Sequence, residues 1–138
     1  MSEEELHILV KELCALPHES EWVEFKQSNS NPEEIGEYLS VLANAACLEN
    51  KEHGYLIYGI QDSSHRVVGT DFKPRTKKVR GQELENWLVT QLEPKVDFKF
   101  FEFMHQGFRV VLMQVEPANN RPVAFKNIAY IRVGTYKK

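Results

Sequence analysis

Three stretches of the chain carry apolar residues at the three- and four-residue spacing of a helix that buries one face. The first is expected from about residue 3 to 15, because Ser2 and Glu5 form a capping-box pattern at its start. The second begins at Asn31 and Pro32, residue types favoured at the N-cap and the first helical position. The third is indicated by four large apolar residues, Leu84, Trp87, Leu88 and Leu92. We therefore predict about three helices.

The other apolar segments have the character of strands. Residues 21–27 (EWVEFKQ) alternate, so Val23 and Phe25 face one side of a predicted strand. The continuous apolar run at 55–60 (YLIYGI) predicts a central buried strand, with 66–70 (RVVGT) as its hairpin partner. Further strands are expected at VDFKFFEF, FRVVLMQV, VAFK and AYIRVGTY. The pattern as a whole predicts an α+β domain with a mainly antiparallel mixed sheet.

Composition is that of a single folded domain. The chain has 138 residues, of which 42% are hydrophobic, and a net charge of -3. We divide it into an N-terminal helix (1–16) and a domain (17–138). The chain end has no stop signal of its own, so we expect it to be the N-terminal part of a longer protein. Apolar runs fall short of the ~18–20 residues of a membrane helix. The acidic N-terminus is unlike a signal peptide, and two cysteines without a CxxC spacing indicate a reduced, cytoplasmic protein.

Several catalytic motifs are missing from the sequence. It contains no GxxxxGK[ST] and no GxGxxG, which disfavours a P-loop ATPase and a Rossmann oxidoreductase. It also lacks the GxSxG nucleophile elbow and the HExxH zinc pattern.

Three acidic residues are candidates for a metal site. Glu19 and Glu24 flank the first predicted strand, and Asp62 follows the central one. Carboxylates brought together repel one another unless a divalent cation neutralises them, and oxygen ligands suit magnesium or manganese. Such an ion can activate water for phosphodiester cleavage. The alternative is that Glu24 is a solvated strand residue and Asp62 a turn former.

Basic residues cluster between the central strand and the third helix. A loop of this kind is a common contact for phosphate backbones, although a solvated loop has the same composition. The predicted nucleic-acid contacts are Lys73, Arg75, Lys77, Lys78 and Arg80, with Lys126 and Arg132 on later strands.

Four segments in this order together resemble a known family. ESEWVEFKQS, LSVLANAA, GYLIYGIQD followed by VVGT, and AYIRVGTYKK are similar to the Schlafen-type AlbA-like domain over about residues 17–138. In bacteria such domains occur in transcriptional regulators, divergent AAA-type ATP-binding proteins and RecG-helicase-related proteins. The resemblance implies an α+β domain that binds DNA or RNA, usually N-terminal to a winged-helix or helix-turn-helix region.

The resemblance also implies a nuclease alternative. Animal Schlafen nucleases use an E-x4-E-F-K segment and an aspartate after the G-[VI]-x-D strand as a cation-dependent site that cuts tRNA and rRNA. The matching residues are Glu19, Glu24 and Asp62, with Lys26 completing the EFK segment. Those enzymes clasp RNA between two lobes and this chain has one, so cleavage would need a homodimer. Glu19 and Glu24 point to opposite faces of a straight strand and converge only if the chain bends before Trp22.

The sequence differs from the family pattern in one connection, and it lacks a motif that ATP binding would require. The usual FANT-GG connection is replaced by the longer LANAACLENKEHG, and no phosphate loop supports ATP binding. We therefore expect a nucleic-acid-binding domain of a transcriptional regulator. The alternatives are a magnesium- or manganese-dependent endoribonuclease acting on structured RNA, and a non-catalytic oligomerisation module that pairs through the AYIRVGTY strand.

Overall fold

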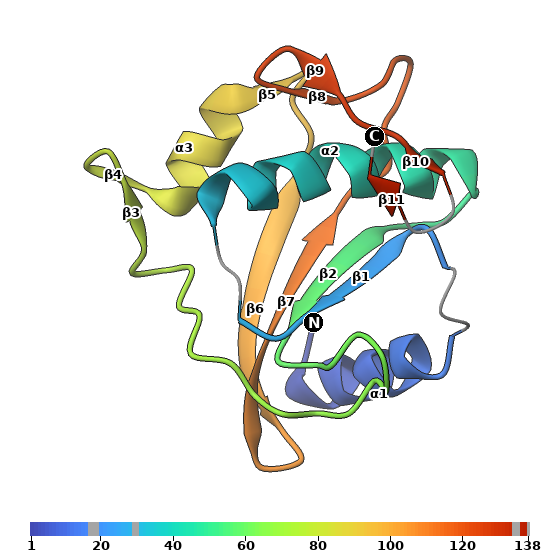
Figure 1. The fold of residues 1–138 in the computed structure, drawn as a ribbon, viewed down its shortest axis with the longest axis vertical. Coiled ribbons are helices and arrows are strands. Elements are labelled where there is room, and N and C mark those ends of the chain that lie inside the picture. The colour runs from blue at the N-terminus through green and yellow to red at the C-terminus, as the bar shows by residue number, and fades with distance from the viewer. Residues whose placement is uncertain (17–19, 29–30, 134–135, 138) are drawn as a thin grey trace.

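The computed structural model describes the chain except for residues 17–19, 29–30, 134–135 and 138. Its centre is a four-stranded sheet with the strand order β1-β2-β7-β6, in which β1 is parallel to β2 and the other neighbours are antiparallel (Figure 1). The strands are β1 Val23–Lys26, β2 Gly54–Tyr58, β6 Phe98–His105 and β7 Phe108–Val115. The buried β2 therefore lies inside the sheet, as its continuous apolar run predicted.

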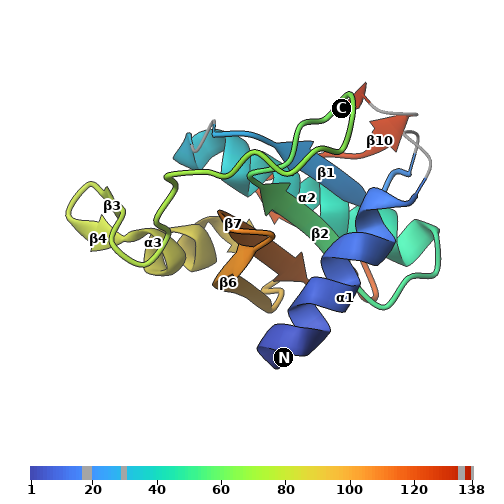
Figure 2. The same ribbon diagram turned by 90° about the horizontal axis from the view of Figure 1, so that it is seen from below.

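Helices cover both faces of this sheet (Figure 2). Helix α1 (Glu3–Cys14) packs on the face that carries Phe25 and Ile57. Helices α2 (Pro32–Leu48) and α3 (Leu84–Gln91) pack on the face that carries Leu56 and Tyr58. Neighbouring side chains of β2 thus enter separate cores because strand side chains alternate. No helix among the described residues is long and apolar enough to cross a membrane.

Among the described residues, seven short strands lie outside the central sheet. Strands β3 and β4 form a hairpin, β5, β8 and β9 form a small sheet, and β10 pairs with β11. Their bounds are β3 Lys78–Val79, β4 Gln82–Glu83, β5 Leu92–Glu93, β8 Ala124–Phe125, β9 Ile128–Ala129, β10 Arg132–Val133 and β11 Tyr136–Lys137. The α+β class with three helices and a mainly antiparallel mixed sheet is therefore confirmed.

Individual elements differ from the prediction at their ends. The Ser2–Glu5 capping box is present at the start of α1. Leu92, expected in the third helix, belongs to β5 because it pairs with Phe125. The segment 66–70 forms only one isolated bridge, Ile60 with Val67, rather than a hairpin strand. The edge of β2 is instead occupied by β7, which offers a longer antiparallel ladder.

Two polar side chains of α2 hold residues 123–130, the C-terminal segment, against the core. Asn44 donates from Nδ2 to the carbonyl groups of Val123 and Tyr130, at 3.1 and 2.9 Å, and accepts from the Val123 amide at 2.8 Å. The Ser40 hydroxyl donates to the Val123 carbonyl at 2.7 Å and accepts from the Tyr130 amide at 2.9 Å. These bonds satisfy backbone groups of a segment that has little regular pairing of its own.

A pair of histidines joins α1 to the end of β6. The Nδ1 atoms of His7 and His105 are 2.9 Å apart, so one ring donates and the other accepts, and His105 is 3% exposed. Burial, and next the positive charge of His7 and Lys11, lower the pKa of His105 below its ordinary value of 6.5. The folded protein therefore favours a neutral His105.

Stability is expected to fall as pH decreases below neutrality. Because the folded pKa of His105 is depressed, its contribution is complete above about pH 6.5 and is lost as pH falls through the lower folded value. Urea denaturation at pH 7.5, 6 and 5 measures this loss. The variant His105→Phe is expected to show a smaller loss between pH 7.5 and 5 than the parent chain. Equal losses in the two proteins would contradict the assignment.

Candidate nucleic-acid interface

Residues 73–80, the basic loop, carry five of the predicted cations and lie between β2 and α3. Four of the side chains are exposed and Lys77 is half-buried: the exposed ones are Lys73, Arg75, Lys78 and Arg80. The loop contains no acidic residue. Within the described part of the chain, Lys73, Lys78 and Arg80 have no ion-pair partner. Unpaired positive charge is thus concentrated in one short segment of an acidic molecule.

Alternation of apolar and cationic residues orients the first half of the basic loop. Phe72 and Pro74 are buried, and Phe72 packs against the Tyr58 ring with 4.7 Å between ring centroids. Lys73 and Arg75, which alternate with them, point outward and are exposed. The loop is therefore fixed on the core by its apolar side chains while its cations face solvent.

The β3–β4 hairpin begins within the second half of the basic loop, continues beyond it to Glu83, and projects beside α3 (Figure 1). Arg80 and Gly81 both have positive φ, 50° and 82°, as a two-residue type I′ turn requires. Arg80 therefore occupies the tip of a tight hairpin. Lys78 is paired in register with Glu83, so the hairpin carries one acidic side chain opposite its cations.

An ion-pair network ties the basic loop to the central sheet. Arg109 of β7 donates to the Phe72 carbonyl oxygen and to the carboxylate of Glu102 on β6. The Nε atom of Arg75 lies 3.5 Å from the other oxygen of Glu102. Glu102 pairs with Val111 and Arg109 pairs with Met104, so Glu102 and Arg109 are diagonal neighbours on the β6–β7 ladder and the sheet positions the loop. Neither residue was predicted from the sequence, because their pairing depends on strand register.

The two predicted cations outside the loop already have partners within the protein. Lys126 forms an ion pair with Glu33, and its ammonium lies 5.4 Å from the centre of the Trp87 ring. Arg132 is 7% exposed and donates to the Glu24 carboxylate and to the carbonyl groups of two nearby residues. Of these two cations, Lys126 is exposed but paired, and Arg132 is directed inward.

The predicted acidic residues are placed in different surroundings. Glu24 is half-buried and paired with Arg132, and Asp62 is exposed in the connection that follows β2. Glu19 lies outside the described residues. No group of three or more potential ligands that could hold a metal ion occurs among the described side chains. The three-carboxylate site thus stays a prediction, and Glu24 would have to exchange Arg132 for a cation to join it.

Lys26 lies at the edge where the parallel strands β1 and β2 both end. Its ammonium is 3.2 Å from the carboxylate of Glu34 and 5.1 Å from the centre of the Tyr38 ring. Partial burial acts to lower the pKa of Lys26, but its interactions with Tyr38 and Glu34 outweigh burial and raise it. Lys26 is therefore a charged side chain that already has partners within the protein. It lies at the sheet edge where β2 ends and the chain continues to Asp62.

Comparisons with known proteins identify the fold and the family. The chain is similar to the DIP2311 protein from Corynebacterium diphtheriae, with 21% identity and a TM-score of 0.55, covering 98% of this chain and 26% of that one. It is also similar to the N-terminal domain of a RecG-related protein from Nitrosomonas europaea, with 21% identity and a TM-score of 0.57, covering 96% and 90%. The chain thus spans about a quarter of the first structure and most of the second.

A search of curated proteins found no match. The sequence profile of one family matches residues 19–138, which include the basic loop, Glu24 and Asp62. This match confirms the resemblance seen in the four sequence segments and covers most of the chain. The protein belongs to the Schlafen, AlbA_2 family.

Proposed function

We propose that this domain binds nucleic acid and that the basic loop contacts the phosphate backbone. The observation that carries the proposal is the exposed, acid-free loop whose cations face solvent while Phe72 and Pro74 anchor it. Membership of the Schlafen, AlbA_2 family and the likeness to a RecG-related domain support the same class of ligand. In the whole protein, we propose that this binding serves a transcriptional regulator.

Charge placement favours backbone contact over base reading. A cation without an ion-pair partner can bind a phosphate without first losing one, and among the described residues Lys73, Lys78 and Arg80 are such cations. Arg75 is held by Glu102 and serves to shape the loop as well as to add charge. The net charge of the chain is -3, so the whole molecule does not attract a nucleic acid and only the basic loop does. Salt screens this attraction over about 8–10 Å at physiological concentration. Binding is thus expected to depend steeply on salt.

Two acidic residues, Glu83 and Glu85, lie beside the basic loop. Together with Pro74 and Arg75 of the loop they line a cavity of about 400 Å³. The two carboxylates oppose a phosphate in this cavity, so their removal is expected to strengthen binding. This opposite sign provides an internal check on any result obtained by removing cations.

Replacing Lys73, Lys78 and Arg80 together by glutamine is expected to lower affinity for nucleic acid tenfold or more near 0.1 M salt. The slope of log affinity against log salt concentration is expected to shrink by about 2–3, since each lost phosphate contact removes about 0.7–0.9. Fluorescence anisotropy with a structured RNA hairpin and a DNA duplex measures both quantities. Glu83→Gln with Glu85→Gln is expected to raise affinity.

The matched control replaces three exposed cations elsewhere in the chain, Lys11, Lys51 and Arg121. It removes the same net charge and is expected to change affinity much less. Equal losses in the two triple variants would show that net charge, and not the basic loop, determines binding. Cleavage of tRNA with manganese that is abolished by Asp62→Ala would instead support the endoribonuclease alternative, and size measurement without nucleic acid tests the oligomerisation alternative.

A further inference from the structure

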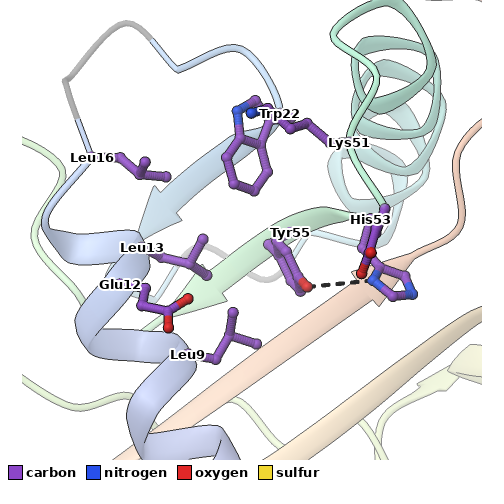
Figure 3. Close-up of a pocket in the computed structure, with 9 residues that line it drawn as sticks. Leu9, Glu12, Leu13, Leu16, Trp22, Lys51, His53 and Tyr55 are labelled. Carbon is purple, nitrogen blue, oxygen red and sulfur yellow. Dashed lines mark hydrogen bonds between the residues drawn. The ribbon is translucent and has the colours of Figure 1, made fainter.

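A small cavity lies on the opposite side of the sheet from α2, between α1 and the start of β2. Its volume is about 230 Å³. Figure 3 shows Leu9, Glu12, Leu13 and Leu16 along one side and Trp22 and Tyr55 facing them. The remaining lining comes from the segment before β2: Lys51, Glu52 and His53. The cavity is below the 300–1,000 Å³ typical of drug-sized ligands, which indicates a small ligand or a single chemical group.

The walls of this cavity are aromatic. The rings of Trp22 and Tyr55 are 6.1 Å apart between centroids and inclined by 58°, so they form two sides of a corner. The His53 ring lies 6.0 Å from Tyr55, and its Nδ1 is 3.5 Å from the Tyr55 hydroxyl (Figure 3). Aromatic faces carry negative charge density and attract cations placed over them.

The rim of the cavity is acidic. Glu12 and Glu52 are exposed lining residues, and the carboxylate of Glu116 lies 3.5 Å from Nε2 of the lining residue His53. Burial, followed by the negative charge of Glu52, Glu12 and Glu116, raises the pKa of Tyr55 to about 12. The carboxylates therefore act on the interior of the cavity as well as on solvent.

The protein already places a cation on one wall. The ammonium of Lys51 lies 5.1 Å from the centre of the Trp22 ring, where Figure 3 shows its side chain extended toward the indole. Lys51 is exposed, so its side chain can leave this position at little cost in burial. An ammonium group thus already lies over the Trp22 ring in the folded protein.

We infer that the cavity lined by Trp22, Tyr55, Glu12 and Glu52 binds a small organic cation with an alkylated ammonium group. Aromatic walls and an apolar floor of leucines suit the methyl groups of such a cation, and the rim carboxylates balance its charge. An inorganic cation would need several oxygen ligands at short range, and no such group occurs among the described residues. The Lys51 ammonium acts as an internal competitor. This inference is independent of the nucleic-acid proposal, since none of the four residues lies in the basic loop.

Titration with choline chloride tests the site. The chain has two tryptophans, and Trp87 is buried in the other core, so the two indole N–H signals in an NMR spectrum separate this cavity from the rest of the molecule. We expect the Trp22 signal to shift with saturation and the Trp87 signal to stay in place. The uncharged isostere 3,3-dimethyl-1-butanol, at equal ionic strength, is expected to shift Trp22 much less. An equal response to both compounds would overturn the inference, because it would show apolar binding alone.

Exposed side chains allow variants that leave the core intact. Lys51→Ala is expected to strengthen choline binding by about two- to fivefold, since it removes the competing ammonium. Glu52→Gln is expected to weaken binding, whereas Glu49→Gln, an exposed neighbour outside the cavity, is expected to have no effect. Unchanged or weaker binding in Lys51→Ala would contradict the arrangement. Stronger binding of a trimethyllysine peptide than of choline would assign the ammonium group to a protein side chain.

Discussion

Replacing Arg132 by methionine is expected to lower the free energy of unfolding by about 3–5 kcal/mol. The side chain of Arg132 is 2% exposed and that of its partner Glu24 is 16% exposed, so the substitution leaves a largely buried carboxylate without its counter-charge. Two backbone carbonyl groups, of Glu21 and Val23, also lose a donor. Urea denaturation monitored by circular dichroism measures the difference.

An exposed ion pair provides the control for this prediction. Arg121 and Glu93 are 65% and 64% exposed, and Arg121→Met is expected to change stability by about 0–1 kcal/mol because solvent screens the pair. The double variant Arg132→Met with Glu24→Leu is expected to recover much of the loss, since no buried charge is then left unpaired. If Arg132→Met cost no more than Arg121→Met, the buried pair would not be a determinant of stability.

The second large effect is expected from Asn44→Ala, which should lower the free energy of unfolding by about 2–4 kcal/mol. One side chain satisfies the amide and carbonyl of Val123 and the carbonyl of Tyr130, and unsatisfied buried groups cost about 1–3 kcal/mol each. The Ser40 hydroxyl still bonds the Val123 carbonyl, which limits the loss. Denaturation gives the total, and hydrogen exchange of the Val123 amide localises it.

Asn86 on α3 is the matched control, because it is exposed and also lies within a helix. Asn86→Ala is expected to be neutral or slightly stabilising, since alanine has the higher helix propensity. Val123 amide exchange that is equally slow in the parent chain and in Asn44→Ala would show that this hydrogen bond does not hold the C-terminal segment.

Only part of the basic loop could be predicted from the local sequence. Its cations were predicted from the sequence, whereas the burial of Phe72 and Pro74, which turns Lys73 and Arg75 outward, was found only in the structure. The link to Glu102 and Arg109 was not predictable, because it depends on the register of two distant strands.

Arg132 shows the opposite case. A cationic residue on a late strand reads like the loop cations, yet folding brings it against Glu24, 108 positions earlier in the chain, and buries it. Because of this pairing, the candidate metal ligand Glu24 is bound to Arg132 in the folded protein. The sequence alone shows Glu24 as a carboxylate without a partner. A single sequence contains no local signal for such a contact, since both residues have ordinary neighbours.

The sequence by itself determined the elements that depend on near neighbours. Helical spacing, the Ser2–Glu5 capping box, the buried run of β2 and the family motifs all arise within short segments, where propensity and burial act locally. Tertiary structure alone decided which charges are free and which are paired, and it built the cavity between Trp22 and α1. These features depend on the parallel pairing of β1 with β2 and the packing of helices on both faces, because only folding brings residues far apart in the chain within the few ångströms over which ion pairs and ring contacts act.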